Sequence, residues 1–406
     1  MTPTRSATAT AAPPPPRRAT RRLLGPADVP PSRPGFEVIG TFNPAAWRDP
    51  DGRIRLLVRV AERPADAAAA HADGHLLLPR YALPPVDDPA PPAAFGHGPA
   101  HPPAPVIIDR ARADDWDRTD ERTPTHRSTG RQRTTFISHL RHVELHEDLS
   151  VARVGPPIEP AAPLTDADAA FGLEDPRVTL ADDRLYATVV TAGFSGVSTR
   201  GWTSDDRGRT WTDRGVWFCR ENKDVVVFPE RRDGHLLALH RPTGTFAPTA
   251  PQMWLARSPD ATHWGGHAPL HLHAARVSTL TDATPAWAAA RTGGGAPPLR
   301  TPHGWLTVYH AAGVPRPADG AFAGRYVAAA ALLDADDPRR VRAVATAPLL
   351  VPEADFERQG FVPEVVFPTA AWTDGDELVL IYGAADTACG LTRVALSDVW
   401  RQLGVG

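Results

Sequence analysis

The sequence contains very little lysine, little cysteine and no long apolar run. Of its 44 basic residues, Lys223 is the only lysine and the other 43 are arginines. Two cysteines, Cys219 and Cys389, are too few for a disulfide framework, which fits a reducing cytoplasm. No run of about 18 apolar residues occurs, so no transmembrane helix is predicted. The 47 acidic residues balance the basic ones, which predicts neither a nucleic-acid nor a membrane partner.

The general replacement of lysine by arginine makes the survival of Lys223 informative. At a solvated surface the two residues are nearly equivalent, so the same drift should have removed this lysine as well. A compact ammonium differs from a planar guanidinium when a small anion must be bound in a tight pocket. We therefore expect a functional role for Lys223, with chance survival as the alternative.

Proline and glycine are abundant, with 45 and 32 residues, together 77 of 406. That share is well above the usual value of about 12 % and argues against a long helical bundle. Hydrophobic residues still make up 42 % of the chain, enough for a substantial core. Residues 1–35 and about 63–128 show little periodicity. We expect the first stretch to be a disordered Pro/Ala/Arg-rich tail rather than an export signal, and the second to be a Pro-rich insertion.

The rest of the chain repeats a cassette made of a proline, a turn dipeptide and an alternating apolar strand. Strands are expected at residues 56–60, 185–191, 236–240, 305–310 and 378–383. Turn dipeptides between apolar strands are hairpin signals. Repetition of about four strands around a centre is typical of β-propellers. The sequence therefore predicts an all-β fold, a five-bladed β-propeller over residues 36–406, with a two-sheet sandwich as the alternative.

Polar residues recur at equivalent places in these cassettes, which in a propeller would bring them together at the mouth of a central funnel. They are Asn43, Arg59, Glu174, Asp175, Lys223, Asp224, His240, Arg241, His310 and Asp386. Carboxylates, cations and imidazoles in one ring suit a sugar together with an anion. Each residue taken alone has a simpler explanation, because Asp175 could fix a turn and either histidine could be a core residue. No metal-ligand spacing occurs, so neither a metal nor a cofactor is expected.

Several motifs resemble those of glycoside hydrolase family 130, which comprises β-mannoside phosphorylases and related inverting β-mannosidases. The motifs are Gly-Leu-Glu-Asp-Pro-Arg at 172–177, Asn-Lys-Asp-Val-Val-Val-Phe-Pro-Glu at 222–230 and Leu-His-Arg-Pro at 239–242. Further matches lie at 42–44, 293–298, 309–310, 366–368 and 382–386. They follow the order of the family from about residue 36 to residue 398.

The resemblance implies inverting cleavage of a β-mannosidic bond in short oligosaccharides. Inorganic phosphate as co-substrate would yield α-mannose 1-phosphate, and water would yield mannose. Asp175 looks like the general acid, which protonates the glycosidic oxygen through a sugar hydroxyl. A phosphorylase needs no second carboxylate as base, but it needs cations to hold phosphate. Lys223 is the first candidate for that role, with Arg241 and Arg177 in support.

The same resemblance assigns the other polar residues to the substrate. Asn43 and Asp386 would bind mannosyl hydroxyls, and Arg59 would bound the sugar or anion site. Glu174, Asp224, His240 and His310 complete the expected substrate site.

Two positions depart from the family pattern. Ser198 stands where the phosphorylases have an arginine. Arg200 lies two positions on, on the same face of the strand, so either it substitutes or the phosphate site is incomplete. Glu364 replaces an asparagine, and its carboxylate would either repel phosphate or act as a base for water.

Three functions follow from these observations. A β-mannoside phosphorylase comes first, and a β-mannosidase with Glu364 or Glu174 as base comes second. The third is a sugar-binding propeller without turnover. The expected partners are a β-mannoside oligosaccharide and inorganic phosphate, with a homo-oligomer left open, and the expected location is cytoplasmic.

Overall fold

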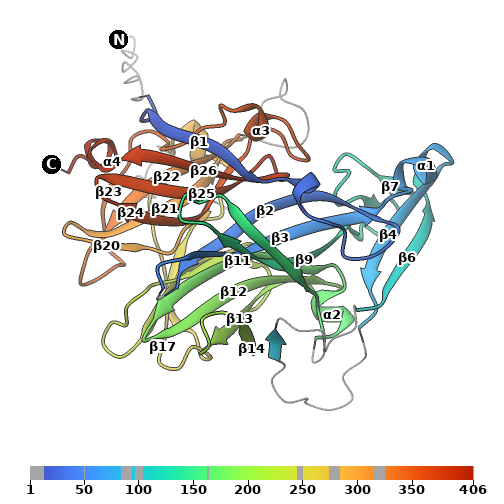
Figure 1. Cartoon of the computed structure of the whole chain (residues 1–406), viewed down its shortest axis with the longest axis horizontal. Coiled ribbons are helices and arrows are strands. Elements are labelled where there is room, and N and C mark those ends of the chain that lie inside the picture. The colour runs from blue at the N-terminus through green and yellow to red at the C-terminus, as the bar shows by residue number, and fades with distance from the viewer. Residues whose placement is uncertain are drawn as a thin grey trace, which may run out of the picture.

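The computed structural model describes residues 13–49, 51–83, 94–96, 104–161, 164–244, 250–273, 284–314 and 325–405. These residues form mostly antiparallel β-strands with a few short helices (Figure 1). The predicted all-β fold class is therefore confirmed.

Most strands of the described residues fall into five successive groups, and the strands within each group pair antiparallel. Group 1 contains β2 (Phe36–Arg48), β3 (Ile54–Pro64), β9 (Ile137–Leu145) and β10 (Val151–Ile158). Group 2 contains β11 (Gly172–Ala181), β12 (Arg184–Gly193), β13 (Gly196–Ser204) and β14 (Thr210–Phe218). Group 3 contains β15 (Asn222–Val227), β16 (Leu236–Pro242), β17 (Trp254–Ser258) and β18 (Gly265–Pro269).

Groups 4 and 5 complete the series. Group 4 contains β19 (Arg291–Gly294), β20 (Leu299–Thr301), β21 (Gly304–Ala312), β22 (Tyr326–Leu333) and β23 (Val341–Val344). Group 5 contains β24 (Val366–Asp374), β25 (Glu377–Ala384), β26 (Ala388–Ala395) and β1 (Arg17–Leu24). A parallel pairing of Gly172 with Ser138 joins groups 1 and 2 in one sheet, and β5 (Ala94–Gly96) extends that sheet beyond β14.

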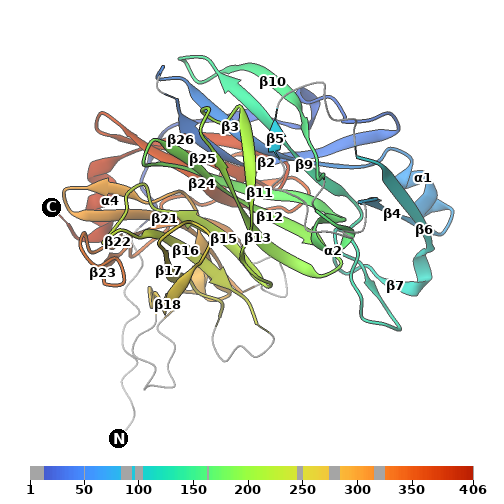
Figure 2. The same cartoon turned by 90° about the horizontal axis from the view of Figure 1, so that it is seen from below.

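The predicted insertion lies between β3 and β9 and contributes two small hairpins. One consists of β4 (His75–Tyr81) and β6 (Val106–Arg112), the other of β7 (Trp116–Asp117) and β8 (Thr125–His126). Both views show β4, β6 and β7 projecting at one end of the molecule together with α1 (Ala67–Ala72) (Figures 1 and 2). The insertion is therefore folded where the structure describes it.

The helices are short. They are α2 (Asp166–Ala169), α3 (Asp355–Arg358), α4 (Leu396–Leu403), η1 (Pro26–Asp28), η2 (Ala113–Asp115) and η3 (Ala286–Ala288), in addition to α1. Within the described ranges, no helix is long and apolar enough to cross a membrane.

All five strands expected from the cassettes form, within β3, β12, β16, β21 and β25, each paired with the strand before it. These strands are buried along most of their length. Their apolar side chains point alternately to the two faces of the strand, so each face contributes to a different core.

Five apolar cores lie between neighbouring groups. Leu57 and Leu173 share the core between groups 1 and 2, and three further cores lie between groups 2 and 3, 3 and 4, and 4 and 5. The fifth core packs β25 and β26 of group 5 against β3 and β9 of group 1, with Val58 and Ile381 among its members. The groups thus contact one another in cyclic order, whereas a two-sheet sandwich would have one core between two layers.

The expectation that residues 1–35 form a disordered tail is wrong for residues 17–24. These residues form β1, which pairs antiparallel with β26 from Arg17↔Val394 to Leu24↔Cys389 (Figure 1). Leu24 is buried, and the Arg17 guanidinium donates to the buried Glu357 carboxylate at 2.6 Å. Arginines that suggested a solvated tail therefore lie on an outer strand, where Arg17 forms an ion pair. After β1 the chain forms η1 and then β2, which begins at Phe36.

Candidate active site

A large cavity gathers polar side chains from all five groups. Its volume is about 850 Å³. Its lining residues include nine of the predicted site residues, namely Asn43, Arg59, Glu174, Asp175, Lys223, Asp224, Arg241, His310 and Asp386. Residues 116–136, from the start of β7 to the residue before β9, form another part of the wall. They are called the wall segment below.

The strands are irregular where several of these residues lie. Pairing registers shift at residues 42–45 of β2, 174–177 of β11 and 223–226 of β15. Within these bulges Asn43, Asp175 and Asp224 have positive φ angles of 49°, 44° and 59°. Asparagine and aspartate tolerate this conformation better than most residues, and the prolines after Asn43 and Asp175 cannot continue the hydrogen-bond ladder. The bulges re-aim these side chains, which is how a regular strand can place a polar group in the cavity.

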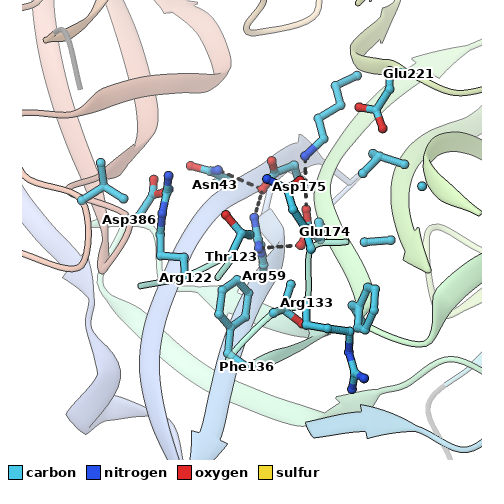
Figure 3. Close-up of a pocket in the computed structure, with 18 of the residues that line it drawn as sticks. Asn43, Arg59, Arg122, Thr123, Arg133, Phe136, Glu174, Asp175, Glu221 and Asp386 are labelled. Carbon is cyan, nitrogen blue, oxygen red and sulfur yellow. Dashed lines mark hydrogen bonds and ion pairs between the residues drawn. The ribbon is translucent and has the colours of Figure 1, made fainter. Parts of the chain in front are cut away.

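Asp175 is held by two donors at one oxygen (Figure 3). Its Oδ1 accepts hydrogen bonds from Arg59 Nη1 at 2.9 Å and from Asn43 Nδ2 at 2.9 Å. Both donors come from group 1, whereas Asp175 belongs to group 2. The carboxylate is thereby fixed between two groups of strands with its second oxygen not used by these two bonds.

Glu174 lies beside Asp175 and shares its arginine. Arg59 Nη2 donates to Glu174 Oε1 at 2.7 Å, and Lys223 Nζ lies 3.6 Å from Glu174 Oε2. The Lys223 side chain is 32 % exposed, whereas the Glu174 side chain is 7 % exposed. Lys223 is therefore a partly open ammonium at the cavity surface, tethered to a buried carboxylate.

The charges around Asp175 decide its protonation state. Burial raises the pKa of the Asp175 carboxyl, but Arg59, Lys223 and Arg177 outweigh burial, so the pKa lies below its ordinary value. Asp175 is thus ionised at neutral pH. A general acid must be protonated, so it needs a further negative charge nearby before it can donate.

A second buried ion pair lies on group 3. Arg241 Nε donates to Asp224 Oδ2 at 2.6 Å, and His310 Nε2 lies 3.6 Å from the same oxygen. Burial raises the pKa of Asp224, but Arg241, His310 and Arg177 reverse this effect and lower it well below its ordinary value. Burial lowers the pKa of His310 to about 4, so its imidazole is neutral at pH 7.

Asp386 lies at another side of the cavity, in the turn between β25 and β26 (Figure 3). Its Oδ2 is 3.3 Å from Nη1 of Arg122, a residue of the wall segment. Burial raises the pKa of Asp386, Arg122 and Arg59 lower it, and Asp175 and Glu174 raise it, leaving it above its ordinary value.

Arg177 and Arg200, both predicted to bind phosphate, do not line the cavity. Arg177 is fully buried and donates from Nε to Gly295 O at 2.7 Å and from Nη1 to Asp175 O at 3.1 Å. Arg200 Nη2 donates to Asp213 Oδ2 at 2.6 Å on the neighbouring strand β14. Arg177 therefore supports the backbone of Asp175, and Arg200 forms an ion pair between two strands of group 2.

His240 and Glu364 also lie away from the cavity lining. His240 is buried against Phe218 and interacts with Asn222 and His267, and its pKa is lowered to about 3 by burial and then by His267. Glu364 forms ion pairs at 3.1 Å and 2.8 Å with two arginines, Arg358 and Arg325. Neither residue is placed to contact a sugar in the cavity.

Other lining residues were missed by the sequence analysis. They are polar or aromatic and include Arg122, Thr123, His126, Gln132 and Phe136 of the wall segment, Arg220 and Glu221 between β14 and β15, and Arg291 and Tyr326 of group 4. The wall segment has no periodicity and no motif. Only its proximity in the fold identifies it.

In the parts of the chain that the structure describes, no group of three or more His, Cys, Asp or Glu side chains is arranged to hold a metal ion. The cavity does have the donor set for an oxyanion and a polyol, because it combines ammonium and guanidinium groups with ionised carboxylates.

Comparison with known proteins places this geometry in context. The model of a family described as β-1,4-mannooligosaccharide phosphorylase, glycoside hydrolase family 130, matches residues 143–403. A β-1,2-mannobiose phosphorylase of Listeria innocua is 31 % identical over 384 residues, which are 94 % of this chain and 96 % of that protein. A 1,2-β-oligomannan phosphorylase of Thermoanaerobacter sp. is 32 % identical over 230 residues, 56 % of this chain and 70 % of that protein.

A solved structure of a Listeria innocua β-1,2-mannobiose phosphorylase in complex with β-1,2-mannobiose superimposes with a TM-score of 0.78. Its sequence identity to this chain is 30 %, and the superposition covers 95 % of this chain and 99 % of the other. The similarity therefore extends over nearly the whole length of both chains.

Proposed function

This chain belongs to glycoside hydrolase family 130, and from that premise we propose that it cleaves β-mannosidic bonds in short oligosaccharides by phosphorolysis. The products would be α-mannose 1-phosphate and a shortened sugar. The observation that carries the proposal is the Arg59-bridged pair of Glu174 and Asp175 beside the ammonium of Lys223, all in one cavity. The β-1,2-mannobiose phosphorylase matches 94 % of this chain and the 1,2-β-oligomannan phosphorylase matches 56 % of it, and both names describe phosphorolysis of β-mannosides.

Asp175 is the proposed general acid. It passes its proton through a sugar hydroxyl to the glycosidic oxygen, and the bond from C1 to that oxygen breaks with its electron pair on the leaving sugar. Phosphate forms the new bond to C1 from the opposite face, so the anomeric configuration inverts. The transition state resembles an oxocarbenium ion, and leaving-group protonation is needed because an alkoxide leaves poorly.

Lys223 is the proposed primary phosphate ligand. Its ammonium has three donors, and its 3.6 Å contact with Glu174 leaves it open to the cavity. Arg241 lines the same cavity and is the supporting cation, already oriented by Asp224. Arg177 is proposed to support the backbone of Asp175, to which it donates a hydrogen bond. Arg200 and His240 do not line the cavity, so we propose that neither contacts phosphate or sugar.

The sugar is proposed to lie against Asn43, Arg59 and Asp386, with Glu174, Asp224 and His310 completing the site. Amide, guanidinium and carboxylate groups can donate to or accept from neighbouring hydroxyls. The neutral His310 donates from Nδ1 to Gly294 O at 3.3 Å, which leaves its Nε2 as an acceptor at pH 7.

Hydrolysis would need a carboxylate base for water. Glu364 does not line the cavity, and Glu174 is engaged by Arg59 and contacts Lys223. Phosphorolysis is therefore the function we retain over a β-mannosidase, and a sugar-binding protein without turnover would not explain the acid and its cations.

We also propose that residues 36–406 form one five-bladed propeller around this cavity, with groups 1 to 5 as blades, residues 63–128 as an insertion, and β1 (Arg17–Leu24) added to the fifth blade from outside this range. The cyclic order of the five cores supports this. A cytoplasmic location is a further proposal, supported by two cysteines that are both free.

The test is to incubate the protein with β-1,2-mannobiose or β-1,4-mannobiose, with and without inorganic phosphate. Phosphorolysis predicts α-mannose 1-phosphate, identified by NMR, only when phosphate is present. Free mannose at the same rate with and without phosphate would establish hydrolysis instead. Binding without either product would leave a sugar-binding protein.

A further inference from the structure

Arg122 reaches the cavity from outside the strand groups. It lies in the wall segment, between β7 and β8, whereas Asp386, to which it is paired, lies in group 5. The mechanism proposed above gives Arg122 no role, although this arginine lines the same cavity.

The guanidinium of Arg122 is held from behind by Asp120. Nε donates to Asp120 Oδ1 at 3.0 Å and Nη2 donates to Asp120 Oδ2 at 3.0 Å, a bidentate pair that fixes the plane of the group. Nη1 is the donor directed at Asp386 Oδ2, at 3.3 Å. Asp120 thereby presents one edge of Arg122 to Asp386.

The backbone around Arg122 is fixed as well. Trp116 pairs with His126, Thr135 N donates to Arg122 O at 3.1 Å, and Thr123 N donates to Asp120 O at 3.2 Å. These bonds make the wall segment a structured part of the cavity and allow it to hold a side chain in place.

Asp386 needs such a partner because of its surroundings. It is buried and faces two carboxylates of β11, Asp175 and Glu174, together with Arg59 of β3 and Arg122 of the wall segment. Arg59 already donates to both carboxylates of β11. Arg122 is thus the cation that contacts Asp386 directly, and the net effect of the site still raises the Asp386 pKa.

We propose that Arg122 is a positioning residue of the mannoside site, which holds Asp386 ionised and oriented as an acceptor for sugar hydroxyls. This inference rests on the proposed function, because it assumes that a mannosyl unit lies against Asp386. The neighbouring placement of Arg122, Asp386 and Asn43 on one side of Asp175 is seen in Figure 3. The insertion then has a role in substrate binding that is additional to the five strand groups.

The experiment compares Arg122→Gln and Arg122→Lys with Arg118→Gln, a partly exposed arginine of the same segment that pairs with Glu121 and does not line the cavity. We expect Arg122→Gln to raise the KM for the mannobiose by about tenfold or more, the size of a lost charge-assisted hydrogen bond. The KM for phosphate should change much less. Arg122→Lys should recover most of the loss, and Arg118→Gln should behave as the wild type.

The pH profile is the readout that a merely structural role would not move. Without Arg122 the Asp386 pKa rises further, so the acid limb of kcat/KM should shift to higher pH. In an Asp386→Asn background the additional effect of Arg122→Gln should nearly vanish, because the partner is gone. An unchanged KM and acid limb, or equal losses in both backgrounds, would overturn the proposal.

A failure of the proposed function is distinguishable from a failure of this inference. If the wild type releases no mannose 1-phosphate, the proposed function fails, and calorimetric binding of the mannobiose to the same variants still tests Arg122. If Arg122→Gln does not fold, Asp120→Asn releases the guanidinium from behind, and the same rise in KM or in dissociation constant is expected. Unaltered binding in a folded Asp120→Asn protein would contradict the inference.

Discussion

Asp175 is ionised at neutral pH because Arg59 and Asn43 donate to one of its oxygens and further cations surround it. Replacing it with asparagine keeps the size of the side chain and removes the proton. We expect Asp175→Asn to reduce kcat by about a thousandfold, the range of a lost general acid. Kinetics with β-mannobiose and phosphate measure this, and a circular dichroism spectrum like that of the wild type controls for folding. Residual turnover within tenfold of the wild type would remove Asp175 from the acid role.

Lys223 contacts Glu174 and faces the cavity. Lys223→Ala should raise the KM for phosphate by about tenfold or more, because a charge-assisted contact to the anion is lost. The KM for the mannoside should rise far less. Arg232→Ala, which removes an exposed arginine paired with Asp336, is the matched control. An unchanged dependence on phosphate in Lys223→Ala would refute the assignment.

The protonation of Asp175 should be linked to anion binding. Cations hold its pKa below the ordinary value, and an anion bound at Lys223 offsets them, so the pKa rises and a proton is taken up. Sulfate is the suitable probe, since it does not itself titrate near pH 5 to 6. Calorimetry in buffers of different ionisation enthalpy should show proton uptake on sulfate binding. Asp175→Asn should bind sulfate with clearly less uptake, and equal uptake in both proteins would argue against the link.

At the scale of elements, β1 is joined to α3 by a buried ion pair. Arg17 Nη1 lies 2.6 Å from Glu357 Oε1, and the hydroxyl of Tyr382 donates to the same oxygen at 2.5 Å. The two charged side chains are 8 % and 0 % exposed. Removing one partner leaves a buried charge uncompensated, which typically costs several kcal/mol.

Arg17→Ala should therefore lower the free energy of unfolding by about 3 kcal/mol. Arg18→Ala is the control on the same strand, because Arg18 is exposed and solvent screening makes its ion pairs with Asp376 and Glu377 contribute much less. Denaturant unfolding monitored by fluorescence measures both. Equal effects for the two substitutions would contradict the distinction between buried and exposed pairs.

The elements show which sequence signals carried information. Apolar strands after a turn dipeptide formed as expected, for example β12 and β25, whose apolar residues occupy both faces because both faces are buried. β1 was missed because an outer strand with four arginines has the composition of a solvated tail. Its stability comes from β26 and Glu357, which are distant in the sequence.

The sequence predicted the cavity residues that lie in motifs of the strand groups, but not those of the wall segment. Asn43, Asp175 and Lys223 lie at bulges that the motifs mark, and the fold brings them together. Arg200 and Glu364 have charges that suit the chemistry, but other ion pairs hold them outside the cavity. Arg122 belongs to a segment without periodicity, so only tertiary structure could reveal it.

At the scale of the whole molecule, the first strand of the chain completes the last group of strands. The core between groups 5 and 1 includes Leu24 of β1, Val58 of β3 and Leu391 of β26, so the two ends of the chain are packed into one unit. The molecule therefore depends on a segment that contributes no residue to the cavity lining.

A chain that begins at Gly25 should accordingly lose stability throughout, with a lower unfolding temperature and reduced turnover, although every cavity residue is retained. Differential scanning calorimetry and phosphorolysis measure the two effects. Adding the missing strand as a peptide is the control, since recovery would show that β1 acts through pairing with β26. A truncated protein with the wild-type unfolding temperature would contradict this view of closure.

A single ε-amino group in the chain, placed at the cavity rather than on the outer surface, has a practical consequence. Reagents that acylate primary amines can modify only Lys223 and the N-terminus, so side-chain labelling goes to one position. A fluorophore introduced there would report occupancy of the cavity directly, and protection of this amine by a bound oxyanion could be read by mass spectrometry from one peptide.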